Sequence, residues 1–139
     1  MEDADLFESF KQEALGDSIG WFPHDTSSLQ DDRLWEFFEE KGHEGLSKYY
    51  QLVEALHRKR GNHSFKVGDV RLAQAMYTTQ EDAEEVVDAL HRHGLLDERL
   101  YSDGIVTIAR VQRNIEDYAE GKARRKLGAL KTNRRKQER

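Results

Sequence analysis

Residues 66–111, KVGDVRLAQAMYTTQEDAEEVVDALHRHGLLDERLYSDGIVTIARV, contain the pattern that decides the fold of this chain. Apolar residues first recur at helical spacing, which predicts a short helix with the buried stripe Val70, Leu72, Ala73 and Met76. A second run predicts another helix with the stripe Ala83, Val86, Val87 and Leu90. Thr79 can cap this second helix, with Asp82 as its reciprocal partner. The sequence therefore predicts two helices joined by a tight turn.

A small β element is predicted after these helices. Gly94 suits the left-handed residue that ends a helix. Beyond it, residues 95–96 and 104–108 are two β-prone runs around Asp103 and Gly104, and we expect them to form a two-stranded wing. The pattern predicts a mainly α protein with a small β element, arranged as a winged helix-turn-helix. Winged helices are most often nucleic-acid binders but also serve as protein docking modules, so the fold alone leaves both functions open.

Length and composition indicate one folded domain with appendages. A chain of 139 residues can bury a single core. Hydrophobic residues make up 37% and charged residues 35%, and no apolar run approaches the roughly 18 residues of a membrane span. The acidic N-terminus lacks the pattern of a secretory signal, and the lack of cysteine excludes disulfides and thiolate metal sites. We expect a cytoplasmic protein with no membrane partner.

We divide the chain into three parts. Residues 1–18 are predicted to form an amphipathic helix and a linker. Residues 19–111 form the winged-helix domain, which begins with a strand at residues 21–25 and has two helices between residues 28 and 60 and a short strand at Phe65. Residues 112–139 continue as a final helix, capped by Thr107, whose order is expected to fade through a basic tail beyond Gly121.

Charge is distributed unevenly along the chain. Residues 1–111 contain 12 Lys and Arg against 23 Asp and Glu, a net charge of -11. Residues 112–139 contain 10 against 4, a net charge of +6. Over roughly a Debye length the basic end attracts polyanions, whereas the acidic body is repelled by them. We expect the two parts to meet different surfaces.

The helix predicted from Gln80 to His93 occupies the position of the DNA-reading helix in a helix-turn-helix. Its composition argues against that role, because it contains five carboxylates but only one arginine, Arg92, and two histidines near its far end. Acids in the first turn suit the helix dipole, but they would still repel phosphate. We therefore expect a solvated face or a partner-protein contact, and for the contact we predict Glu81, Glu84, Glu85 and Asp88.

Basic residues form two groups that could contact phosphates. The candidates in the folded part are Arg58, Lys59, Arg60, Lys66 and Arg71, although cations at a helix C-terminus also suit its dipole, by about 0.3 to 1 kcal/mol. The second group lies in the tail: Lys122, Arg124, Arg125, Lys126, Lys131, Arg134, Arg135 and Lys136. Binding through this tail would be sequence-tolerant and strongly salt-dependent. The alternatives are a disordered end and a basic helix that pairs with the acidic body.

The sequence shows no pattern of a catalytic or metal site, and we expect no enzyme activity, cofactor or metal. His91 and His93 are two apart on a predicted helix and point in different directions. A solvated helix face explains the carboxylates at helical spacing, which are Glu36, Glu39, Glu40 and Glu44. Four aromatic residues follow the apolar stripes, which favours core positions over base stacking: Trp21, Trp35, Tyr49 and Tyr50.

Five short motifs occur in order along the chain: Trp21-Phe22-Pro23-His24-Asp25, Asp31-Asp32-Arg33-Leu34, Gly42-His43-Glu44-Gly45, Gly94-Leu95-Leu96-Asp97, and Val106-Thr107 leading into Arg110-Val111-Gln112-Arg113. Together they resemble the N-terminal winged-helix domain of phage and prophage replisome-organiser proteins, which are related to the DnaD-type primosomal proteins of Gram-positive bacteria. The resemblance covers residues 19 to about 120. It implies a role in starting DNA replication, through DNA contact, self-association or both. Primosome or helicase-loader proteins would be partners.

These observations leave competing functions. The first is a phage-type replication-initiation module that holds DNA through basic segments and associates with itself or with primosomal proteins. The second is an acidic adaptor or inhibitor that docks on a basic protein and mimics nucleic acid. A third, an RNA-binding accessory protein, differs only in the polyanion. Leu6, Phe7 and Phe10 further predict a dimer contact through the N-terminal helix, the alternative being that this helix packs on its own domain.

Overall fold

The computed structural model describes residues 2–20 and 31–138. The protein is mainly helical with a small antiparallel sheet, and its elements in chain order are α1 (Asp3–Ala14), α2 (Asp32–Arg58), β1 (Phe65–Lys66), α3 (Val70–Ala75), α4 (Gln80–Arg92), α5 (Glu98–Ser102), β2 (Ile105–Val106) and α6 (Ala109–Gln137). The strand expected at residues 21–25 lies outside the described residues.

Helices α3 and α4 and the turn between them follow the predicted pattern. The hydroxyl of Thr79 accepts a hydrogen bond from the backbone N–H of Asp82, as expected of the cap. Leu72 and Met76 are buried. Val70 does not join their stripe and is 61% exposed. At 3.6 residues per turn Val70 lies about 160° around the helix from Leu72, so both cannot face the core.

The sheet differs from the expected wing. β1 pairs with β2, with Phe65 opposite Val106, and residues 95–96 contribute only an isolated bridge from Leu96 to Ile108. The side chain of Asp97 accepts a hydrogen bond from the backbone N–H of Leu100 and so caps α5, which fills the connection where a hairpin was expected. A local side-chain cap therefore replaces strand pairing by a helical turn.

The core lies where α2, α3, α4 and the sheet meet the first turns of α6. Phe37, Leu56 and Leu90 are fully buried there. Gly42 has a φ of 69°, in the left-handed region, and divides α2 at a kink into two helical segments, as expected of the two helices between residues 28 and 60. Residues 28–30, at the expected start of the first, lie outside the described residues.

Two expectations about aromatic and capping residues near this core are wrong. Trp35 is 48% exposed and packs on Phe38 instead of entering the core. Leu34 and Phe37 already occupy the inward face of that turn. Thr107 does not cap α6, because its hydroxyl donates to the backbone oxygen of His63. Tyr49 is buried and Tyr50 is half-buried, as expected, whereas Trp21 lies outside the described residues.

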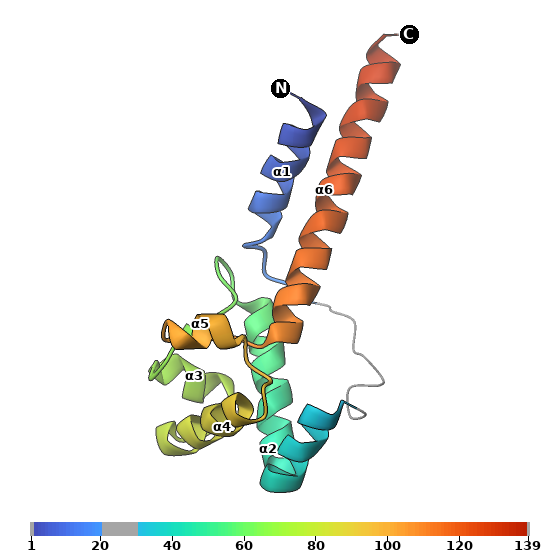
Figure 1. Cartoon of the computed structure of the whole chain (residues 1–139). Helices are drawn as coiled ribbons and strands as arrows, with labels where there is room; N and C mark the ends of the chain where they lie inside the picture. Colours follow the sequence, from blue (N-terminus) through green and yellow to red (C-terminus); the bar gives the residue numbers. More distant parts are fainter. Residues whose placement is uncertain (1, 21–30, 139) are drawn as a thin grey trace.

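Helices α1 and α6 form an arm that projects from the globular part, with both chain ends at its far end (Figure 1). α1 runs antiparallel to α6. The basic stretch beyond Gly121 was expected to lose order, but it is helical to Gln137. The reason is that α1 packs along it, burying Ala123 and partly covering Leu127 and Leu130.

Candidate nucleic-acid interface

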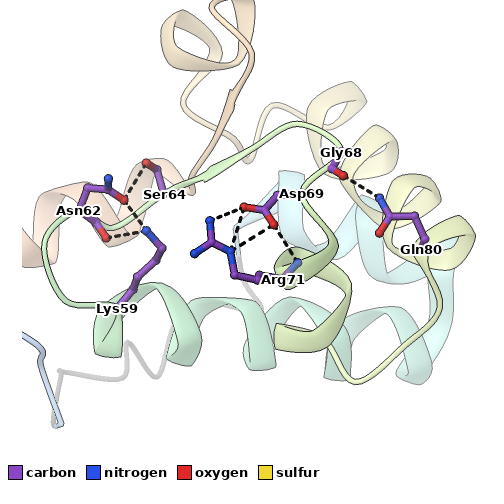
Figure 2. Close-up of polar contacts among 7 residues, drawn as sticks. All are labelled: Lys59, Asn62, Ser64, Gly68, Asp69, Arg71 and Gln80. Atoms are coloured by element: carbon purple, nitrogen blue, oxygen red, sulfur yellow. Dashed lines mark hydrogen bonds and ion pairs between the residues drawn. The ribbon is translucent and has the colours of Figure 1, made fainter.

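The C-terminal end of α2 holds the first group of predicted phosphate contacts. Lys59 follows the last helical residue and donates from Nζ to Asn62 Oδ1 at 2.6 Å (Figure 2). Its ammonium also lies 5.4 Å from the centre of the Phe65 ring. Arg58 and Arg60 are exposed. Arg58 has only a long contact of 4.0 Å to Glu54. Two guanidinium groups are thus presented at this end of the helix.

The other two predicted contacts of the folded part are Lys66, which lies in β1, and Arg71, which lies in α3. Lys66 is exposed at the end of β1. Arg71 is paired with Asp69, with Nη2 2.9 Å from Oδ2 (Figure 2). The hydrogen bond from the Arg71 side chain lowers the pKa of Asp69. Arg71 is therefore less available to a phosphate than the sequence suggested.

Most predicted cations of the tail are paired within the arm. The ion pairs join Lys122 to Asp17, Arg124 to Glu120, Lys126 to Glu13, and both Lys131 and Arg134 to Asp3. Lys126 also lies 4.6 Å from the centre of the Phe10 ring. The helical order and the pairing correspond to one of the alternatives stated for this segment, a basic helix that pairs with acidic residues, and not to a disordered end. A sequence count of basic residues thus overstates the free positive charge.

Three of the tail cations have no ion pair within residues 2–20 and 31–138: Arg125, Arg135 and Lys136, all exposed. Arg125 and Lys136 are eleven residues apart, a spacing that returns to nearly the same side of a helix. By the same geometry they lie roughly opposite Ala123, which is buried on the side that α1 covers. The outer side of α6 therefore presents two free cations, Arg125 and Lys136, and Arg135 lies about a quarter turn around the helix from them.

The base of the arm brings together predicted cations that are far apart in the sequence. Asp17 Oδ2 accepts hydrogen bonds from Lys122 Nζ and from the hydroxyl of Tyr118. The Lys122 hydrogen bond is the largest cause that lowers the pKa of Asp17, and the charge of Arg60 contributes as well. Asp17 and Tyr118 were not predicted as partners, since no periodic pattern connects a linker residue to a helix a hundred residues later.

A network of backbone contacts fixes the arm on the globular part. His63 is buried and places Nδ1 2.6 Å from the oxygen of Leu56 and Nε2 3.0 Å from the oxygen of Leu15. Gly61 donates its backbone N–H to the oxygen of Gly16 at 2.8 Å. These contacts hold the end of α1 against the end of α2, and Asp17, next to Gly16, in turn contacts Lys122 on α6.

Helix α4 presents an acidic surface, as its sequence indicated. The four residues predicted to contact a partner are exposed: Glu81, Glu84, Glu85 and Asp88. Arg92, the one arginine of this helix, donates to both carboxylate oxygens of Glu40, at 2.6 and 2.7 Å, and to Asp88 at 2.9 Å. The hydrogen bonds from Arg92 and His93 lower the pKa of Glu40 to about 2. This arginine therefore secures α4 to α2 and does not offset the acidic face.

A small apolar cavity of about 90 Å³ lies beside α4. Gln80 lines it and donates from Nε2 to the backbone oxygen of Gly68 at 3.1 Å (Figure 2). Val67, which is 52% exposed, lies at its edge. By contrast, the predicted oligomer contacts Leu6, Phe7 and Phe10 are half-buried on α1, which packs against α6 of the same chain.

Within residues 2–20 and 31–138, no three His, Asp or Glu side chains are grouped as a metal site would require. None of the helices in that part of the chain combines the length and the apolar character needed to cross a bilayer.

A family model described as Lin1244/Lin1753-like, N-terminal, matches residues 21–111. The match covers more than half of the chain, and the chain belongs to this family. It takes in α2 to β2 and the first turn of α6, and it leaves α1 and most of α6 outside. No curated protein and no solved structure matches the chain.

Proposed function

We propose that this member of the Lin1244/Lin1753-like N-terminal family is a DNA-binding and self-associating module of a phage-type replication-initiation protein, a replisome organiser, acting in the cytoplasm of a bacterial host. The replication role rests on the resemblance of the five sequence motifs. The mode of DNA contact rests on the arrangement of charge in the structure. The observation that supports it most is that three exposed cations of α6, Arg125, Arg135 and Lys136, have no ion pair within residues 2–20 and 31–138.

The proposed fold type is a winged helix-turn-helix. In its support, α3 and α4 are joined by a tight turn and are followed by a strand, β2, that pairs with β1 and bridges to Leu96. In such a fold α4 would be the reading helix. Its exposed carboxylates and its paired Arg92 oppose entry into a groove lined by phosphates. We therefore assign DNA contact to the arm and to the end of α2.

The proposed contacts are non-specific in chemistry. Arg125, Arg135 and Lys136 on α6, with Arg58 and Arg60 at the end of α2, are exposed cations that can meet phosphates. They include no aromatic side chain that could stack on bases. Binding should therefore tolerate any sequence and weaken steeply with salt, with a slope of about -0.9 in log K against log salt for each phosphate neutralised.

The test is a titration of a fluorescently labelled 20-base-pair duplex at several salt concentrations. We expect R125E/R135E/K136E to abolish most of the binding and to flatten the salt slope. The matched control is E81Q/E85Q on α4, which also changes exposed charges and should leave the slope unchanged. Binding that ignores salt, or an α6 variant that binds like the unmodified chain, would contradict the proposal.

A second function, docking of α4 on a basic partner protein such as a primosomal or helicase-loader protein, is favoured by one observation. The carboxylates of α4 are exposed next to the cavity that Val67 and Gln80 line. In this alternative the acidic globular part, and not the arm, makes the decisive contact. If E81Q/E85Q impairs function in cells while the purified variant still binds DNA normally, the adaptor role is supported over DNA contact.

A further inference from the structure

Acidic residues of α1 form ion pairs with cations on one part of α6. Glu13 Oε2 lies 3.1 Å from Lys126 Nζ. Asp3 lies 3.2 Å from Lys131 Nζ and 3.8 Å from an Nη atom of Arg134. Two carboxylates of α1 thus pair with three cations of α6.

Helix α1 packs mainly on α6 and not on the other helices or strands of the described chain. α1 lies alongside α6 and away from the rest of the globular part (Figure 1). Its only fully buried side chain within residues 3–14 is Ala14, next to the base of the arm, whereas Leu6, Phe7 and Phe10 are only half-buried. Lys11, which pairs with Glu116 at 2.6 Å, also lies in the half nearer the base. The outer half is thus held largely by exposed ion pairs and partial apolar contacts.

We infer that α1 is an internal competitor of nucleic acid through Asp3 in its outer half and Glu13 at its inner end, and that Lys126, Lys131 and Arg134 form a second phosphate-binding surface which a polyanion gains by displacing these two carboxylates. This inference rests on the proposed DNA-binding function and adds a regulated surface to it. These three cations lie on the side of α6 that α1 covers, apart from the free cations on the outer side.

The competition follows from elementary electrostatics. Exposed ion pairs are individually weak and are screened by salt, so they can be exchanged. A DNA phosphate brings the same negative charge to the same cations and also releases counterions from the duplex. Binding should therefore loosen the outer half of α1, which carries Asp3, whereas at the inner end only the Glu13 side chain leaves Lys126, because Lys11 and the contacts of the His63 ring keep that end of the helix in place.

The test compares two α1 variants with the same change in net charge. D3N/E13Q removes the carboxylates that pair with α6 cations. D5N/E8Q removes one Asp and one Glu of α1 that make no ion pair with α6 in the described chain. With a labelled 20-base-pair duplex at about 0.1 M salt, we expect D3N/E13Q to bind about 5- to 10-fold more tightly than D5N/E8Q. Its salt slope should be steeper by about 0.9 for each released cation that reaches a phosphate.

Hydrogen exchange supplies an independent measurement on the unmodified chain. We expect amides in the outer half of α1 to lose protection when the duplex is added, while those near Ala14 keep it. If the two variants bind equally, or if α1 keeps its protection, the competitor role is wrong.

The two proposals fail in different ways. If R125E/R135E/K136E binds the duplex as tightly as the unmodified chain while D3N/E13Q still binds it more tightly than D5N/E8Q, DNA contact by the outer side of α6 is wrong and the competition by α1 stands. The reverse pattern supports the outer surface and removes the competition. If no variant binds the duplex, both are contradicted.

Discussion

The ion pair between α2 and α4 gives a prediction whose magnitude can be worked from the structure. Glu40 accepts two hydrogen bonds from Arg92 and one of 3.1 Å from His93, and its side chain is 32% exposed. These partners lower the pKa of Glu40 from its ordinary 4.5 to about 2. Unscreened, such a shift would equal about 3.4 kcal/mol, and solvent exposure reduces the expected contribution to about 1 kcal/mol.

The sign of the pH dependence follows from the direction of this shift. Because the pKa of Glu40 is lowered in the folded state, its stabilisation is complete above pH 4.5 and is lost as the pH falls towards about 2. At pH 7 we expect E40Q to lower the free energy of unfolding by about 1 kcal/mol, measured by urea denaturation with circular dichroism. The difference from the unmodified chain should shrink as the pH approaches 2.

The neighbouring Glu39 provides the control, because it is exposed and has no ion pair among residues 2–20 and 31–138. E39Q should leave stability within about 0.5 kcal/mol. In addition, E40Q/R92Q should cost little more than E40Q alone, since both changes break the same contact. Equal effects of E39Q and E40Q, or additive effects of E40Q and R92Q, would refute this account of how α4 is held.

Three further predictions concern stability, each measured by urea denaturation. G16A should destabilise the chain by about 1 to 3 kcal/mol, since a Cβ at Gly16 would lie 3.1 Å from the backbone oxygen of Gly61. The control G128A, where a Cβ on α6 would meet open space, should stabilise the chain by about 0.5 to 1 kcal/mol. Equal effects of the two variants would contradict the close approach of Gly16 to Gly61. Y77G should stabilise by up to about 1 kcal/mol, because Tyr77 has a φ of 54° and is 81% exposed; a loss would reveal a packing role for its ring. Burial lowers the pKa of His57, so stability should fall as the pH drops below 6.5, and H57Q should weaken that dependence; an unaltered pH profile would argue against it.

Local sequence signals predicted the elements that depend on short-range chemistry. The Thr79 cap and the left-handed Gly94, with a φ of 70°, are as expected, because capping and positive φ are decided within a few residues. Exposed carboxylates on α4 were also expected from composition. These features do not depend on how distant segments meet.

The features that the sequence did not predict depend on long-range contacts. Nothing near Phe65 indicates that its partner is Val106 and not a strand from residues 95–96. Likewise, the order of the basic stretch of α6 depends on α1, more than a hundred residues away in the sequence. For the candidate site this means that basic residues could be identified from sequence, whereas the division into paired and free cations could not.

The most direct test of the central claim is to map DNA contact by NMR on the 139-residue chain, because each backbone amide then reports separately. A labelled sample is titrated with an unlabelled 20-base-pair duplex, and the amide shift changes are followed residue by residue. We predict the largest changes in residues 124–136 of α6 and in residues 58–60, with little change in α4. Largest changes in residues 80–92, with α6 unaffected, would contradict the claim that DNA is held by the arm and not by the helix-turn-helix.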